Sequence, residues 1–559
     1  MSILKKGSRN IFSRRGPVIS AWSPLAQPFF RTLWVANLVS MIGAWVHEVG
    51  AAWLMTSLTM SPLTVAMIQT ATTLPLFLAA LPAGALADIL DRRRLLIFTQ
   101  TWMLVSALGL GITTLLGLAS PVVLLAFTFF LSLGGAINGP AWQAVIPELV
   151  SREELPSAVT LGSVGYNIAR AIGPALGGLV VALVGPGITF LVNAVSFSGV
   201  VAVLVRWRHT PQESTLPTEH LIGAMRSGIR YVRHAPEVQA IFVHALFFSL
   251  FTSPLWAFLP IVAREYLQLG PPGYGMLLGF FGVGALIGAA LLPWVRSRFS
   301  LNFVAATTTV LLAVVIACMA MILNPPVMLI VMMAGGMAWL TLLSVLMTAM
   351  QAVIPSWVRG RVVSVFMLVF FGGFAAGSVL WGGVALWIGI KPTLVGVAVL
   401  LAAGVFLTRK HELPTGEDLD LTPAQYFPSF LTGHGLANEE RPVLVVIDRR
   451  VDPDRLGEFV EAVRPLKMMR LRDGAIRWNL FRDVTEPGHY IESFIVESWV
   501  EYMRQHERLT VSDREIEDRI AAFHVGDTPS TTQHFIAELV PKGGARPVAG
   551  EGQGDAPSP

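Results

Sequence analysis

Long apolar segments and short polar loops alternate through residues 29–408. A helix that crosses the hydrocarbon core of a bilayer needs about 20 apolar residues, and this region supplies such segments repeatedly. The pattern therefore predicts an all-α polytopic membrane region with twelve transmembrane helices. The predicted spans are residues 29–55, 61–87, 94–118, 121–142, 156–183, 187–206, 237–263, 273–295, 302–323, 327–350, 361–385 and 388–408.

The composition agrees with a membrane protein. Hydrophobic residues make up 53% of the chain, charged residues make up 14%, and the mean hydropathy is +0.62, all outside the range of soluble domains. The first apolar segment is a full span without a small-residue cleavage site, so we expect no cleavable signal peptide. The only cysteine, Cys318, lies within a span, and no internal disulfide is possible.

Arginine and lysine residues gather in the loops that follow even-numbered spans. Because loops rich in Lys and Arg stay on the cytoplasmic side, both termini are predicted to be cytoplasmic, in a multi-pass protein of the bacterial plasma (inner) membrane. The net charge of +4 is explained by these loops and requires no nucleic-acid partner. The basic loop residues are Arg92, Arg93, Arg94, Arg152, Arg206, Arg208, Arg226, Arg230, Arg233, Arg296, Arg298, Arg359 and Arg361.

The membrane region also contains signs of an internal repeat. The pentapeptide Gln143–Pro147 recurs as Gln351–Pro355, and each copy follows a Gly-Gly pair in the fourth span of its half. Parallel repeats of this kind predict two six-helix halves with a substrate path between them. The predicted regions are the N-terminal segment 1–28, the halves 29–206 and 237–410, the connector 207–236, a linker at 411–440, a soluble domain at 441–541 and a tail at 542–559.

The loop after the second span carries five charges within seven residues, Asp88 to Arg94. It resembles the Gly-x-Leu-Ala-Asp-x-x-Gly-Arg-Arg loop of major facilitator superfamily transporters, although Asp91 stands where the family often has Gly. The resemblance implies that Gly84, Asp88 and Arg92 form a conformational latch that holds the outward-open state. Arg92 has two possible partners, Asp88 and Glu148. The alternative is a solvated turn whose arginines only fix the orientation.

The fifth span contains Gly173, Pro174, Gly177 and Gly178. A proline here kinks a helix, and small residues allow another helix to approach closely. The pattern is similar to the Gly-Pro-x-x-Gly-Gly signature of exporters in the superfamily. Together with Asn167 and Arg170, it resembles the enterobactin-exporter-like efflux group over roughly residues 25–410. The resemblance implies outward transport, whereas a helix-packing role needs no transport direction.

Ionisable residues within spans are costly and usually functional. Glu48 is the first proton-coupling candidate, because a carboxyl in a membrane interior can load and release a proton. Arg170 and the adjacent His47 are the other two. The alternative is a permanent structural pair of Glu48 with Arg170 or Arg31. The candidates for lining a substrate cavity are Asn37, Trp45, Gln69, Asn167, His244 and Trp256.

The composition changes sharply after Lys410. Residues 441–541 read as strand, helix, two strands, helix and strand, which is a ferredoxin-like α+β order. The region resembles the antibiotic biosynthesis monooxygenase-like domains, which are small dimeric α+β barrels. This resemblance implies possible dimerisation through the domain, and His506 is its candidate functional residue. Dimerisation or ligand sensing is favoured over catalysis.

We find no metal-ligand cluster, no Gly-rich phosphate loop and no Walker sequence, so we expect no cofactor and no ATP-driven transport. The leading prediction is a secondary active transporter, not an enzyme. It is a proton-coupled exporter (antiporter) of a small amphiphilic molecule such as a drug or siderophore-like metabolite, working by alternating access. Two alternatives remain, a transporter whose C-terminal domain modifies the cargo and a transporter-like sensor that moves nothing.

Overall fold

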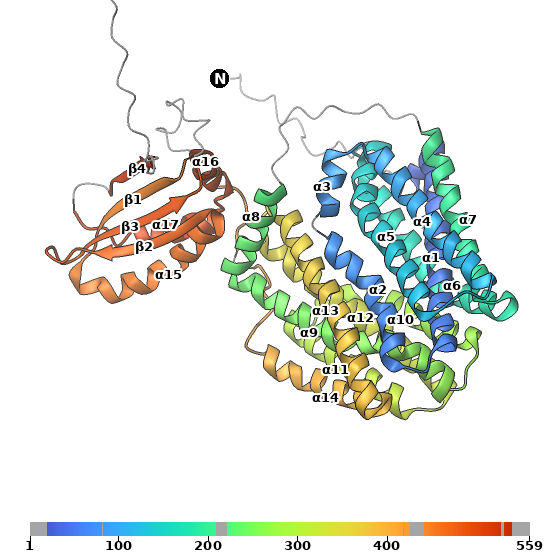
Figure 1. Cartoon of the computed structure of the whole chain (residues 1–559). Helices are drawn as coiled ribbons and strands as arrows, with labels where there is room; N and C mark the ends of the chain where they lie inside the picture. The colour runs from blue at the N-terminus through green and yellow to red at the C-terminus, as the bar shows by residue number, and fades with distance from the viewer. Residues whose placement is uncertain are drawn as a thin grey trace, which may run out of the picture. The chain divides into compact units, whose positions relative to one another are not determined.

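The computed structural model of the chain consists of two compact units, Met1–Leu419 and Asp420–Pro559 (Figure 1). The two units are described separately. We call them the membrane unit and the C-terminal unit. The side chains of residues 85, 88, 89 and 221–225 lie outside the description. The described residues are 20–80, 82–207, 221–417, 419–424, 441–526 and 530–538.

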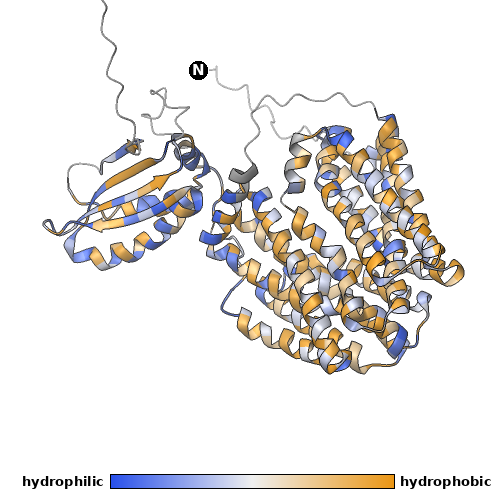
Figure 2. Cartoon of the chain, viewed as in Figure 1, coloured by the Kyte–Doolittle hydropathy of each residue, from blue (hydrophilic) through white to orange (hydrophobic). Residues whose placement is uncertain are grey.

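Twelve helices of the described chain are long and apolar enough to cross a membrane, which confirms the predicted number of spans. Apolar residues dominate their length in Figure 2. The helices of the first half are α1(Pro28–Leu58), α2(Pro62–Ala79), α3(Pro82–Ile89), α4(Arg92–Leu115), α5(Pro121–Leu149), α6(Leu155–Val184) and α7(Pro186–Arg206). Those that follow are α8(Leu221–His234), α9(Pro236–Ile261), the π-helical turn η2(Val262–Tyr266), α10(Pro271–Arg296), α11(Leu301–Met321), α12(Pro325–Val353), α13(Arg359–Ile388) and α14(Ile390–Thr408).

The second predicted span, 61–87, is two helices rather than one. Helix α2 ends at Ala79 and α3 begins at Pro82. Proline has no backbone N–H to donate to the preceding turn, and its ring clashes with the carbonyl four residues earlier. The connector 207–236 also differs from a plain loop, because α8 occupies much of it.

The last three spanning helices of each half begin at a constant spacing from their counterparts. Helices α5 and α12 begin at Pro121 and Pro325, and α7 and α14 begin at Pro186 and Ile390, each pair 204 residues apart. Helices α6 and α13 both end before a glycine with positive φ, a conformation that only glycine adopts at little cost. These features confirm two six-helix repeats.

The repeated pentapeptide is a poorer guide to this duplication. Its two copies are 208 residues apart, whereas α5 and α12, the helices that carry them, begin 204 residues apart. The copies are therefore about one helical turn out of register within these helices. The first copy, Gln143–Pro147, lies inside α5, whereas the second passes the end of α12 at Val353. The pentapeptides therefore do not occupy equivalent places in the two halves.

We call the end of the helical bundle that carries Arg92, Arg206, Arg296 and Arg359 the basic end, and the other the opposite end. The two halves meet along α6 with α10 and along α2 with α13. A Cβ built on Gly178 would lie 2.5 Å from the backbone oxygen of Pro271. Such backbone contact requires glycine, and it joins the halves toward the opposite end.

The C-terminal unit has the predicted order of elements. Its four strands form an antiparallel sheet in the order β2-β3-β1-β4, which is a ferredoxin-like topology. The last helix, α17, starts after Thr510, which forms a capping box with Asp513. The elements are β1(Val443–Arg450), η4(Pro453–Arg455), α15(Leu456–Asp473), β2(Ala475–Arg482), β3(His489–Val496), α16(Trp499–Arg508), α17(Val511–Ala521) and β4(Thr532–Ile536).

Strand β3 of this unit carries a buried carboxylate that lies between cationic side chains. Glu492, which is 1% exposed, pairs with Arg449 and Arg470 and accepts a hydrogen bond from the Trp478 indole at 3.2 Å. Burial alone would raise the pKa of Glu492, but the charges of Arg470 and Arg449 lower it overall. A buried charge is tolerated when it is paired in this way.

His489, at the start of β3, lies between two carboxylates. Its Nε2 is 3.0 Å from Asp448 and its Nδ1 is 3.0 Å from Asp483. Hydrogen bonds to Asp448 and Asp483 raise the pKa of His489. The protonated ring, with two N–H donors, satisfies both carboxylates.

We predict that the β2–β3 hairpin loses stability as the pH rises. A raised pKa in the folded state contributes stability that is full below the unfolded value of about 6.5 and is lost as the pH passes the folded pKa. Hydrogen exchange of the hairpin amides at about pH 5 and about pH 9, corrected for intrinsic rates, should show the loss. The His489→Gln variant should show no such pH dependence, and an equal dependence in that variant would contradict the assignment.

Candidate functional site

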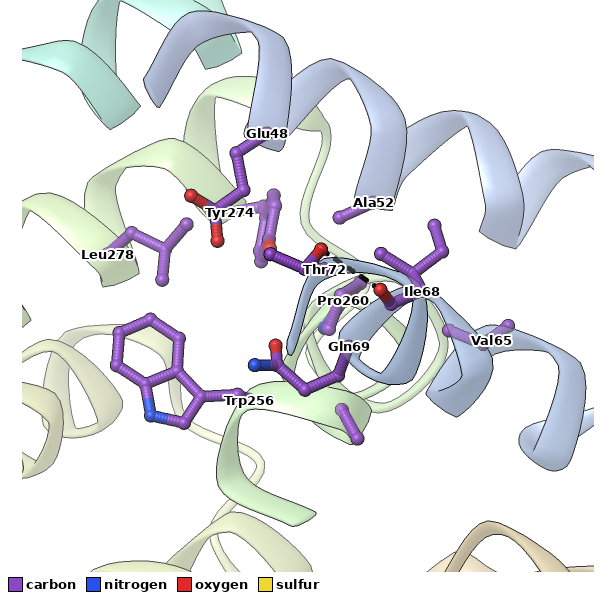
Figure 3. A pocket seen from close by; sticks show the side chains of 11 residues that line it. Glu48, Ala52, Val65, Ile68, Gln69, Thr72, Trp256, Pro260, Tyr274 and Leu278 are labelled. Atoms are coloured by element: carbon purple, nitrogen blue, oxygen red, sulfur yellow. Dashed lines mark hydrogen bonds between the residues drawn. The ribbon is translucent and has the colours of Figure 1, made fainter. Parts of the chain in front are cut away.

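A small cavity lies between the two halves of the membrane unit. Glu48 from α1 reaches it, together with Gln69 from α2, Trp256 from α9 and Tyr274 from α10. Figure 3 shows the Glu48 carboxylate, the Gln69 amide and the Trp256 indole facing the same space. The remaining lining residues are Ala52, Val65, Ile68, Thr72, Ala257, Pro260 and Leu278.

A buried cation from α6 acts on this carboxylate. Arg170 is 7% exposed, and its positive charge acts on Glu48. Its guanidinium carbon lies 5.4 Å from the ring centroid of Phe281 in α10, a cation–π geometry. Among the described ion pairs there is none between Glu48 and either Arg170 or Arg31. Glu48 is therefore influenced by a cation without being locked to it.

Aromatic rings form the wall of the cavity on the side of the second half. The Trp256 ring is 5.0 Å from that of Phe281 and 5.5 Å from that of Trp339 on α12. Edge-on contacts of this kind hold the indole in one orientation. Carboxylate, amide, phenol and indole groups in a mostly apolar space suit a ligand that is both apolar and polar.

His47 lies apart from the cavity, within the first half. It is 4% exposed, its ring centroid is 4.7 Å from that of Phe190 on α7, and neither ring nitrogen has a hydrogen-bond partner in the described structure. Adjacent residues on a helix project about 100° apart, so Glu48 and His47 face different neighbours. Only Glu48 of these two lines the cavity between the halves.

The structure separates the six predicted cavity residues. Gln69 and Trp256 line the cavity with Glu48. Asn37 lines a second small cavity between α1, α5 and α6, and His244 lines a groove between α9, α11 and α14. Trp45 packs against Gly173, and the Asn167 amide donates to the Ser163 carbonyl at 2.9 Å.

The glycines of the fifth-span pattern lie at helix contacts. A Cβ on Gly173 would lie 2.5 Å from Trp45, and one on Gly177 would lie 3.0 Å from the Val46 backbone, both in α1. Gly178 instead faces α10 of the second half. The pattern therefore lines a seam that joins α1, α6 and α10. Pro174 is buried within α6.

At the basic end, Arg92 pairs with Glu148. Its Nη1 lies 2.5 Å from the Glu148 carboxylate and donates to the Ala144 carbonyl at 3.1 Å. Asp91 caps α4 through a hydrogen bond from the Arg94 amide at 2.7 Å. Gly84 has open space around its Cβ position. The Asp88 side chain lies outside the described residues, so the predicted latch at Asp88 stays a prediction.

His506 in the C-terminal unit is held by packing. Its Nδ1 donates to the Tyr502 carbonyl at 3.0 Å, and its ring lies against the Tyr502 ring. Burial lowers the pKa of His506. The Tyr502 hydroxyl is 2.7 Å from His534 Nε2. No group of three or more His, Cys, Asp or Glu within the described residues could hold a metal ion.

The family described as "Transmembrane secretion effector" matches residues 19–541 of the chain, which includes the twelve spans and the predicted C-terminal domain. The chain belongs to this family. It is a family of major facilitator superfamily transporters and not of enzymes. The monooxygenase-like identity of the C-terminal unit finds no support beyond its small antiparallel sheet.

Relatives with assigned functions are similar to the membrane unit at low identity. The multidrug efflux pump Tap of Mycolicibacterium fortuitum is 27% identical over 68% of this chain and 95% of its own. The staphyloferrin A transporter of Staphylococcus aureus is 24% identical over 46% of this chain, and the enterobactin exporter of Shigella boydii is 26% identical over 47%. The matches cover 66% and 62% of those two relatives, less than two thirds of their length.

Solved structures support the fold of the membrane unit. A bacterial homologue of the human lysosomal transporter Spinster aligns with a TM-score of 0.53 at 14% identity, over 68% of this chain and 96% of that chain. A bacterial homologue of the iron transporter ferroportin aligns with a TM-score of 0.53 at 17% identity, over 68% and 98%. At these identities the likeness shows a shared fold alone.

Tyr274 is the cavity residue that sequence reasoning missed. It follows Pro271-Pro272-Gly273 in the first turn of α10, and a tyrosine at the start of a span usually anchors the membrane interface. Here its ring is buried and reaches the cavity instead. The sequence around Tyr274 gives no signal of this position, because it does not show which face of α10 packs against the first half.

We predict that Gly178→Val destabilises the protein far more than Gly162→Val does. Both residues lie in α6, but a Cβ at residue 162 meets nothing within 4 Å, whereas one at residue 178 meets the Pro271 backbone. Overpacking costs about 1–3 kcal/mol. Thermal unfolding in detergent should therefore show a lower midpoint for Gly178→Val only. Equal midpoints for the two variants would contradict the seam between the halves.

Proposed function

We propose that the chain is a proton-coupled exporter of a small amphiphilic molecule that works by alternating access between its two halves. The observation that carries this proposal is the Glu48 carboxylate in a cavity between the halves, beside Gln69, Trp256 and Tyr274. A carboxyl in this position can bind a proton in one state of the carrier and release it in another. The efflux and siderophore-transport functions named for its relatives support the same direction and cargo class.

Arg170 has a specific part in this proposal. Its charge favours the ionised form of Glu48, while the apolar surroundings favour the protonated form. Arg170 is stacked over Phe281 of the second half. Separation of the halves would therefore free its guanidinium to move and would change that balance, because Coulomb energy in a low-dielectric space varies steeply with distance. Proton release is thereby linked to a change in helix packing.

Contacts between the two halves at the opposite end support the proposal of a gate that opens and closes during transport. Arg264 in η2 of the second half donates to the Thr56 hydroxyl of α1 at 3.1 Å and lies 5.6 Å over the Trp53 ring. Trp53 in turn lies 6.2 Å from Tyr274. These contacts stand at the opposite end, where the backbones of α6 and α10 also touch. We propose that they form an opposite-end gate, which must open for release.

We expect Glu48→Gln to abolish uphill export and to retain downhill exchange. Glutamine keeps the shape and hydrogen bonding of the protonated carboxyl but cannot release a proton. In inverted vesicles, a pH gradient should drive accumulation of a cationic dye or a macrolide by the wild type only. Counterflow of the same compound without a gradient should persist in the variant.

The matched control is Glu265→Gln, which removes a carboxylate from η2 outside the cavity. It should leave gradient-driven accumulation near the wild-type level. Gradient-driven transport by Glu48→Gln at the wild-type rate would exclude Glu48 as the coupling group. Loss of counterflow as well would indicate a structural role.

We also expect Arg264→Gln to shift the carrier toward a state open at the opposite end. The lost cation–π contact and hydrogen bond are worth about 1 kcal/mol, or about a five-fold change in population. Spin labels at Met60→Cys and Leu323→Cys, in a Cys318→Ser background, should report longer distances between the halves. Lys391→Gln is the control, because Lys391 stacks on Tyr266 within one half, and unchanged distances in Arg264→Gln would contradict the gate.

Three narrower expectations stay predictions. They are the cytoplasmic location of both termini, the latch function of Arg92 with Glu148, and dimerisation through the C-terminal unit. The last is compatible with partly exposed apolar side chains on alternate positions of the sheet, such as Phe481 and Phe535.

A further inference from the structure

A second site lies on the outside of the membrane unit, away from the cavity that contains Glu48. It is a groove between α9, α11 and α14 at the basic end, where α14 packs against both other helices. Its lining combines apolar and hydrogen-bonding side chains. Its lining includes His244, Phe303, Ala306, Val405, Arg409 and Glu412.

The groove presents one cation and one anion side by side. Arg409 and Glu412 both line it, and neither forms an ion pair or hydrogen bond with a described residue. The Arg409 guanidinium is stacked over the Phe406 ring at 5.2 Å, which leaves its N–H groups available for an anion. Two side chains of opposite charge, three residues apart and not paired with each other, suit a ligand that carries both charges.

The local structure holds this pair in place. The Leu413 amide donates to the Asn302 carboxamide oxygen at 2.7 Å, and Leu413 is buried. This anchors the segment after α14 to the first turn of α11, with Glu412 next to the groove. His244 Nδ1 donates to the Ala240 carbonyl at 2.9 Å, so its Nε2 is the nitrogen left to serve a ligand.

The surface around the groove is that of a helix face in contact with lipid. Phe303 is 52% exposed, Phe406 is 68% exposed and Leu407 is 71% exposed. Exposed apolar side chains on spanning helices contact acyl chains, while Lys and Arg at helix ends reach the headgroup region. The groove therefore spans the level of the headgroups and the start of the acyl chains.

We propose that this groove binds a phospholipid whose headgroup carries a phosphate and a primary ammonium, as in phosphatidylethanolamine. The phosphate pairs with Arg409. The ammonium donates to Glu412 and to His244 Nε2. The first part of an acyl chain lies along Phe303, Ala306 and Val405. A choline headgroup has no N–H to donate, and an anionic glycerol headgroup places no positive charge against Glu412.

The test is native mass spectrometry of the full chain in detergent, with phosphatidylethanolamine, phosphatidylcholine or phosphatidylglycerol of identical acyl chains added separately. The wild type should bind phosphatidylethanolamine about five-fold more tightly than phosphatidylcholine, which corresponds to about one hydrogen bond, because choline keeps the positive charge but has no N–H to donate to Glu412. Glu412→Gln should remove that preference. Arg409→Gln should weaken the binding of phosphatidylethanolamine and of phosphatidylcholine about five-fold.

Arg298→Gln is the matched control. Arg298 is an exposed arginine of the same end and stacks on Trp294 at 4.7 Å, but it does not line the groove. This variant should bind the three lipids as the wild type does. Equal binding of phosphatidylethanolamine and phosphatidylcholine by the wild type would overturn the proposal. So would tightest binding of phosphatidylglycerol, or equal losses in Arg298→Gln and Arg409→Gln.

Discussion

The core of a bilayer offers no hydrogen-bond partner, and this constraint explains where the membrane unit keeps its few charged side chains. Helices satisfy their own backbones, so the cost falls on side chains such as Glu48 and Arg170. Arg170 is buried over an aromatic ring, and Glu48 opens into a cavity shared with Gln69 and Tyr274. A carboxylate placed between two halves that must move is in a position to couple a proton to that movement.

The close packing of the halves depends on residues with almost no side chain. Gly178 and Gly275 let the backbones of α6 and α10 touch, and Gly382 brings α13 against Leu63 of α2. Between helices in lipid there is little hydrophobic driving force, so such close approach supplies much of the attraction. These contacts are extensive but weak one by one, which is compatible with a seam that opens and closes.

Much of the fold could be predicted from the sequence because the bilayer sets the length and polarity of each span. The twelve spans, the two halves and the order of the C-terminal strands were confirmed. The break at Pro82 was missed because residues 61–87 contain no charged side chain that would mark the end of a span. The pentapeptide repeat was a poor guide because its copies are one helical turn out of register. Of the site, Glu48, Gln69 and Trp256 were predicted to matter, but periodicity cannot say which helices meet across the halves. Tyr274 was missed for that reason, and His47, a neighbour of Glu48 in sequence, faces another surface.

The central claim is that binding of cargo and loss of a proton from Glu48 are linked. The most direct test is to mix purified protein with cargo in weakly buffered solution and to measure the protons released. Linkage requires the wild type to release protons on binding, in an amount that varies with pH. Glu48→Gln should bind the cargo and release none. Equal proton release by the two proteins, or binding by the wild type without any release, would contradict the account.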